Sequence, residues 1–221
     1  MKISVRTLQA RLAALGCHPG PIDGLNGKRT RAALADALAF HNARSARDLF
    51  GPDGLHCIVG HWTAGAYGRN AVEERSYNLL IDQHGVEHPG QFEPETQANY
   101  AVGRAASHTR HANTGRIGVA MDAMAGANER PFRRGSAPLT WPQVQGYVSC
   151  VATLCERFWI PVTRWSVLTH AEVQPTLGIA QRFKWDVTWL PDMSAPGDPI
   201  DVGDRLRDMI RAAMSEAGEA A

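Results

Sequence analysis

Leucines repeat at helical spacing near the start of the chain, where Leu8, Leu12 and Leu15 fall at i, i+4 and i+7. This spacing places their side chains on one face of a helix, and Gly16 follows where a left-handed C-cap would end it. The next segment, PGPIDGLNGKRT, is rich in glycine and proline and predicts a loop. Residues 30–41 are rich in alanine and leucine and predict a second helix. Residues 1–45 are therefore expected to form a small helical unit.

Short apolar runs bounded by turn residues characterise the chain after residue 55. Such runs are typical of strands, and they occur at 57–59, 77–82, 116–121 and 166–168. Thr140 and Gln143 form a capping box that opens a predicted helix reaching residue 158. A last helix is predicted over 202–213, where apolar residues recur at helical spacing. Strands interleaved with helices predict an α/β domain over 55–221, joined to the N-terminal unit by a linker at 46–54.

The composition excludes several classes of protein. Of the 221 residues, 44% are hydrophobic and 20% are charged, which is typical of globular domains and not of disordered or fibrous chains. A formal net charge of +1 argues against nucleic acid or an anionic membrane as a partner. The uncharged run 135–155 contains prolines and glutamines, so we expect no transmembrane helix. Because charged residues interrupt the first apolar positions, we expect no secretory signal and synthesis in the cytoplasm.

Cysteines and histidines offer different candidates for chemistry. The four cysteines contain no CxxC pair, so we expect reduced core residues and neither a disulfide framework nor a thiolate zinc site. His61 and His170 each follow a predicted strand, and imidazoles at neighbouring strand ends can begin a zinc site. Asp186 can supply a third ligand. Spacing alone favours three unrelated residues, because no compact HExxH motif joins them.

The N-terminal unit resembles the peptidoglycan-binding module found on many cell-wall hydrolases. The matching residues, in order, are Leu8, Gln9, Leu12, Leu15, Gly16, Asp23, Gly24, Gly27, Thr30 and Ala33. The resemblance implies that the unit binds the bacterial wall. The loop positions Asp23, Gly24, Gly27 and Thr30 are then its candidate wall-binding residues.

Five ordered segments between about residues 55 and 213 resemble the zinc-dependent N-acetylmuramoyl-L-alanine amidases, the type shared by small phage lysozymes and peptidoglycan-recognition proteins. These segments are IVGHWTAG, SYNLLIDQHGVEHPG, ASHTRHANTGRIGVAM, LTHAEV and KWD. The resemblance implies a mixed central β-sheet flanked by helices. It also implies Zn²⁺ held by His61, His170 and Asp186, and hydrolysis of the amide bond between N-acetylmuramic acid and L-alanine.

The same resemblance assigns roles around the expected zinc. Zinc lowers the pKa of a bound water and polarises a carbonyl, so the reaction needs no protein nucleophile. Lys184 is expected to face the developing oxyanion and Tyr77 to offer its hydroxyl to the water or the oxyanion. The alternatives are a solvated surface lysine and a strand aromatic in the core. His108, Thr109 and Arg110 are expected to contact the muramyl sugar or the stem peptide.

Three features depart from the family pattern. Ala120 stands where related recycling amidases carry a glutamate base. His170 and Lys184 are 14 positions apart (184 − 170), and Asp186 is followed by Val-Thr-Trp in place of Pro-Gly. Glu172 and Asp192 are therefore alternative third ligands. Glu172 is alternatively a residue that orients a ligand histidine.

These observations together predict a modular peptidoglycan amidase, with bacterial peptidoglycan as its partner and a monomeric state. The absence of a recognised leader fits a phage endolysin that acts on the wall after release from the host cytoplasm. A delivered antibacterial toxin would share these sequence features. The alternative from another functional class is a peptidoglycan recognition protein of the same fold without catalysis.

Overall fold

The computed structural model describes residues 5–40, 43–46, 49 and 54–219. Most of the predicted linker at 46–54 lies outside the described residues, as do the last residue of the second predicted helix and both ends of the chain. In the described part, no helix is both long and apolar enough to cross a membrane.

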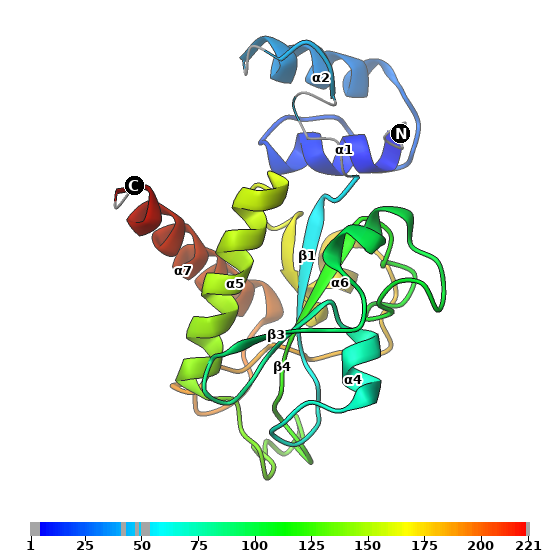
Figure 1. Cartoon of the computed structure of the whole chain (residues 1–221). Coiled ribbons are helices and arrows are strands. Elements are labelled where there is room, and N and C mark those ends of the chain that lie inside the picture. Colours follow the sequence, from blue (N-terminus) through cyan, green and yellow to red (C-terminus); the bar gives the residue numbers. More distant parts are fainter. Residues whose placement is uncertain (1–4, 41–42, 47–48, 50–53, 220–221) are drawn as a thin grey trace.

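The N-terminal unit contains α1 (Val5–Ala14) and α2 (Lys28–Phe40), which lie together at one end of the molecule (Figure 1). Leu8 and Leu12 of α1 are buried against alanines of α2. Gly16 has φ +76°, and its N–H donates to the carbonyl of Ala13 at 3.0 Å. This left-handed residue ends the helix as predicted, because glycine adopts positive φ without steric cost.

The second unit is built on a sheet of five strands in the order β3-β2-β4-β1-β5. The strands are β1 (Cys57–Trp62), β2 (Leu79–Ile81), β3 (Glu87–Pro89), β4 (Arg116–Met121) and β5 (Val167–Thr169). Strands β2, β4, β1 and β5 run parallel, whereas β3 pairs antiparallel with β2. The predicted mixed central sheet is therefore confirmed.

Helices cover both faces of this sheet. Figure 1 shows α5 (Trp141–Phe158) and α7 (Pro199–Glu219) on one side, and α4 (Ala71–Ser76) and α6 (His170–Leu177) on the other. A short 3-10 helix, η1 (Pro94–Asn99), precedes β4 in the chain. Along β1, Ile58 belongs to the large core shared with α5 and α7, while Cys57 and Val59 belong to a smaller core with α6. This alternation follows from the period of two along a strand.

Several elements differ from the sequence expectations. The strand predicted over 77–82 is shorter, because Tyr77 ends α4 by donating its N–H to the carbonyl of Glu73 at 3.0 Å. The hydrophobic and polar pattern also did not predict four elements of the structure, α4, β3, η1 and α6. All four cysteines are free, as expected, but Cys17 is only half-buried and is not a true core residue. The capping box of α5 and the amphipathic C-terminal helix are present.

Candidate metal centre

Three side chains from separate elements meet at one edge of the sheet. His61 lies near the carboxyl end of β1, and His170 is the first residue of α6, directly after β5. Because β1 and β5 are parallel neighbours, their carboxyl ends lie side by side, which is where α/β sheets build their sites. Asp186 comes from the loop after α6, and its carbonyl accepts the N–H of Ala171 at 2.6 Å. That bond holds the loop against the start of α6.

The three side chains form what we call the histidine–aspartate cluster. The Oδ2 atom of Asp186 lies 3.0 Å from Nδ1 of His170 and 3.4 Å from Nδ1 of His61. Ligand atoms of the three residues lie within 4.8 Å of one another, and all three residues are buried. Two imidazole nitrogens and a carboxylate oxygen converging on one point are a donor set that suits a catalytic zinc ion. The residues present therefore fit the metal that the sequence implied.

The charge states in the cluster also favour a cation. Burial would raise the pKa of Asp186, but hydrogen bonds from His170 and His61 hold it well below its usual range. Burial, assisted by the neighbouring His170, lowers the pKa of His61 to about 4. At neutral pH the cluster thus offers an ionised carboxylate and a neutral imidazole at His61, the forms in which these groups bind metals.

Tyr77 and Lys184 both lie near the cluster. The Tyr77 ring lies 5.0 Å from the His61 ring, centroid to centroid. Burial and the negative charge of Asp186 raise the pKa of Tyr77, so its hydroxyl stays protonated and can donate a hydrogen bond. Lys184 is exposed, yet its positive charge contributes to the lowered pKa of His61. It lines a groove next to the cluster together with Phe183, Gln174 and Pro199.

Two of the three expected substrate-binding residues lie behind the cluster instead of on an open surface. His108 and Thr109 are buried, and Nδ1 of His108 lies 3.2 Å from Nε2 of His61. Gly118 makes room for this ring, since a Cβ atom there would meet the His108 ring at 2.5 Å. Arg110 makes an exposed side-chain contact with the ring of His111. Of the three, only Arg110 has a side chain placed to meet a ligand from solvent.

The two alternative third ligands are engaged elsewhere. Glu172 pairs with the buried Arg207 at 2.8 Å and accepts the N–H of Thr169 at 2.7 Å. The expectation that Glu172 orients a histidine is therefore wrong: it caps α6 and ties that helix to α7. Asp192 forms a half-exposed ion pair with Arg205 at 2.9 Å. Asp186 is the acid that lies with the two histidines.

The candidate wall-binding residues shape the loop between α1 and α2. The buried amide of Gln9 donates to Asp23 at 2.9 Å and to Thr30 at 3.1 Å, and accepts the N–H of Gly24 at 2.9 Å. The carbonyl of Gly27 accepts the N–H of Arg31 in the first turn of α2. The sequence pattern that suggested wall binding is therefore explained by the hydrogen bonds that shape this loop, without any ligand.

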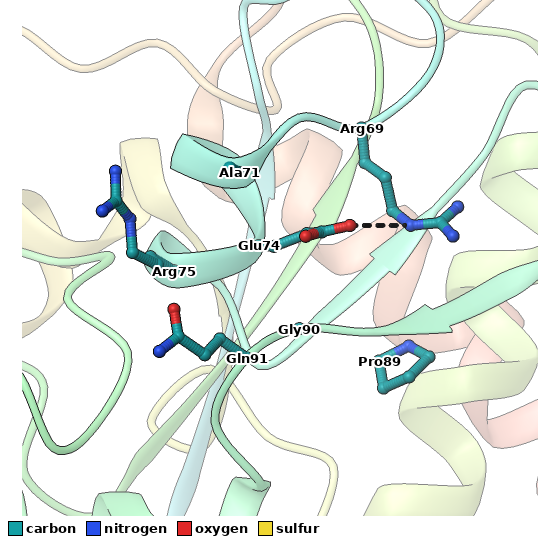
Figure 2. Close-up of a pocket in the computed structure, with 7 residues that line it drawn as sticks. All are labelled: Arg69, Ala71, Glu74, Arg75, Pro89, Gly90 and Gln91. Carbon is teal, nitrogen blue, oxygen red and sulfur yellow. Dashed lines mark hydrogen bonds and ion pairs between the residues drawn. The ribbon is translucent and has the colours of Figure 1, made fainter.

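A second pocket lies away from the cluster, along α4. Figure 2 shows Glu74 and Arg75 on α4, Gln91 on the segment next to this helix, and the side chain of Arg69 joined to Glu74. Arg69 and Glu74 form an ion pair at 3.1 Å that is partly exposed to solvent. The pocket contains none of the candidate catalytic residues.

Two residues near the sheet edge were missed by the sequence analysis. Gln181 lies 3.0 Å from Nε2 of His170, and Asp122 is a fully buried carboxylate directly after β4. The contact of Gln181 depends on the path of an irregular loop, so no sequence signal points to it. Asp122 has a weak signal, because it stands two positions after Ala120 at the end of an apolar strand.

Comparison with known proteins supports the assignment of the N-terminal unit. Residues 3–42 match the family model described as "Putative peptidoglycan binding domain". The N-terminal unit is thus similar in sequence to peptidoglycan-binding modules. No curated protein sequence matches the chain significantly.

Among solved structures, the chain is similar to the N-acetylmuramoyl-L-alanine amidase LysC from Clostridium intestinale URNW, with 13% identity and a TM-score of 0.41 over 72% of this chain and 86% of that one. It is also similar to the N-acetylmuramyl-L-alanine amidase AmiD from E. coli, solved with anhydro-N-acetylmuramic acid-L-Ala-D-gamma-Glu-L-Lys, with 21% identity and a TM-score of 0.41. That match covers 66% of this chain and 56% of the AmiD chain, so it spans little more than half of AmiD. Similarity at this level does not by itself establish a function.

Proposed function

We propose that the protein is a zinc-dependent amidase that hydrolyses the bond between N-acetylmuramic acid and the L-alanine of the peptidoglycan stem. The observation that carries the proposal is the histidine–aspartate cluster, in which two imidazole nitrogens and one carboxylate oxygen converge. The ordered sequence segments around these three residues point to the same activity. Zinc bound there would supply an activated water and polarise the substrate carbonyl.

The side chains of the protein then have two roles: they bind the metal and stabilise the charge on the substrate oxygen. His61, His170 and Asp186 would hold the metal from two strand ends and one loop. The protonated hydroxyl of Tyr77 is available to donate a hydrogen bond to the negative charge that develops on the substrate oxygen. Lys184 presents a solvent-accessible cation to the same oxygen. Because Ala120 replaces a carboxylate base, these two donors are the side chains on which catalysis depends.

The N-terminal module extends the proposal to the whole chain. Its match to a peptidoglycan-binding family favours peptidoglycan as the partner. A second contact with an insoluble repeating polymer keeps the catalytic unit close to its substrate and raises the effective concentration. We propose that the protein acts as a monomer and serves as a phage endolysin on the host wall.

The test is digestion of purified peptidoglycan sacculi with and without a chelator, with the new chain ends identified by mass spectrometry. We expect free L-alanine amino termini, which disappear with chelator and return when zinc is added. Reducing sugar ends would instead indicate a glycosidase and overturn the proposal. Sacculi that bind the protein but release nothing would favour a recognition protein without catalysis.

A further inference from the structure

Gln181 is a buried glutamine in the loop between α6 and Asp186, and its amide bridges two parts of the site. Its Nε2 atom lies 2.8 Å from the carbonyl oxygen of Arg110, and its Oε1 atom lies 3.0 Å from Nε2 of His170. The backbone N–H of Gln181 donates to the side chain of Gln174 at 2.9 Å, which fixes the loop locally. The side-chain amide is thus held at both its oxygen and its nitrogen, on a backbone that is itself fixed.

The direction of each hydrogen bond follows from the acceptors present. A backbone carbonyl can only accept, so the group facing Arg110 must be the NH₂ of the amide. The oxygen of Gln181 therefore faces His170, and an amide oxygen can only accept. The Nε2 atom of His170 must then carry the hydrogen. This leaves Nδ1 as the nitrogen of His170 that faces Asp186 and the centre of the cluster.

The other ligand histidine is set by an equivalent arrangement with different residues. The carbonyl of Arg116 lies 3.1 Å from Nε2 of His108, which makes that nitrogen a donor. The Nδ1 atom of His108 is then an acceptor, and it lies 3.2 Å from Nε2 of His61. His61 can donate through Nε2, and its Nδ1 atom faces Asp186 and the cluster. Both histidines thus present the same ring nitrogen, Nδ1.

We propose that Gln181 is a positioning residue that holds His170 in the Nε2–H form and couples this ligand to the backbone of Arg110. The proposal rests on the proposed zinc site and adds to it a residue outside the three ligands. Groups that hold the second ring nitrogen of a ligand histidine fix its orientation and its proton. Through its NH₂ group, Gln181 also joins the metal site to the loop that carries the one exposed candidate substrate contact, Arg110.

The experiment compares two substitutions at this position with a matched control. Gln181→Met has nearly the same length but neither donates nor accepts a hydrogen bond. Gln181→Glu keeps an oxygen for His170, replaces the donor to Arg110 with a second oxygen and adds a negative charge. The control is Gln83→Met, because Gln83 contacts the ring of His84, a histidine outside the cluster, at 3.0 Å.

Zinc affinity is measured by chelator competition without peptidoglycan, and the ring proton of His170 is located by ¹⁵N NMR in the zinc-free and zinc-loaded protein. We expect Nε2–H at His170 already in the zinc-free wild type. Gln181→Met should weaken zinc binding by about 10–100-fold. Gln181→Glu should retain most of the affinity, and Gln83→Met all of it.

Two results would overturn the inference. One is wild-type zinc affinity in Gln181→Met, and the other is an Nε2 atom of His170 that carries no hydrogen in the wild-type protein, a measurement that does not depend on how any variant folds. A wild type that binds no zinc would instead overturn the proposed function itself. If Gln181→Met keeps both its amidase activity on sacculi and wild-type zinc affinity, the positioning role is rejected. The proposed function is then still supported.

Discussion

Two buried carboxylates at the same edge of the parallel strands have opposite surroundings. Asp186 accepts hydrogen bonds from two imidazoles, whereas neither side-chain oxygen of Asp122 has a hydrogen-bond partner among the described residues. Burial and the nearby charge of Glu73 raise the pKa of Asp122 to about 6, while the pKa of Asp186 is held low. Burial raises the pKa of both carboxyls, so the difference comes from the imidazoles beside Asp186 and the negative charge of Glu73 near Asp122.

This contrast shows what makes one end of the sheet suited to a cation. A buried carboxylate stays ionised only where donors or positive charge replace its lost hydration. At the ends of β1 and β5 the histidines supply ring nitrogens that either donate a hydrogen to Asp186 or, without that hydrogen, bind a metal. At the end of β4 no donor faces Asp122 among the described residues, so its carboxyl is neutralised by binding a proton more readily than Asp186. The sequence places an acid at both positions, but the structure makes only one of them a candidate ligand.

The largest effect is expected from removing the acid of the cluster. Asp186→Ala should weaken zinc binding by more than about 100-fold, beyond the usual effect of a residue outside the ligand set, and amidase activity should fall with it. Zinc content after gel filtration and chelator competition measure this. Asp192→Ala, which removes a surface ion pair, is the matched control. Unchanged zinc in Asp186→Ala would remove the basis of the comparison.

The sequence predicts the two histidines of this site better than its acid. His61 and His170 follow apolar runs, and parallel strands bring such positions to one edge. Asp186 lies in an irregular loop whose position depends on a bond to the backbone of Ala171, so only the family resemblance could indicate it. The contact of Gln181 with His170 has the same origin in loop geometry.

The role of Glu172 could have been found from the sequence. Thr169 and Glu172 have the spacing of a helix N-terminus, which predicts a capping contact and the start of α6. The pairing of Glu172 with Arg207 could not be found, because it joins residues 35 positions apart on different helices. Tyr77 was predicted to begin a strand because an apolar run follows it, and this run gave no sign that a helix, α4, ends there.

The next largest effect is expected from removing the positive charge of Lys184, which lies near the histidine–aspartate cluster. Lys184 is the only lysine after residue 28, and its positive charge contributes to the lowered pKa of His61. Lys184→Ala should lower kcat by about 100-fold, the cost of losing one donor to a developing oxyanion, while zinc affinity stays unchanged. Steady-state kinetics on a soluble muramyl peptide separate kcat from KM. Lys28→Ala in α2 is the control, and full turnover in Lys184→Ala would show a surface lysine without a catalytic role.

The smallest effect is expected at Asp122, and it has the opposite sign to ordinary buried substitutions. The pKa of this carboxyl is about 6 in the folded protein against 3.8 as its ordinary value, so the folded state binds more protons between these pH values. The stability of the wild type should therefore fall as the pH rises from about 4 to 6 and stay lower above it.

Asp122→Asn keeps the shape and removes the buried charge, so it should stabilise the protein at pH 7 by about 2 kcal/mol and have little effect at pH 4. Urea unfolding at both pH values measures this difference. Asp82→Asn is the matched control at the end of β2, because Asp82 accepts hydrogen bonds from His88 and two backbone N–H groups and should lose stability at pH 7. A loss of stability in Asp122→Asn at pH 7 would mean that Asp122 is ionised and partnered, and the contrast with Asp186 would disappear.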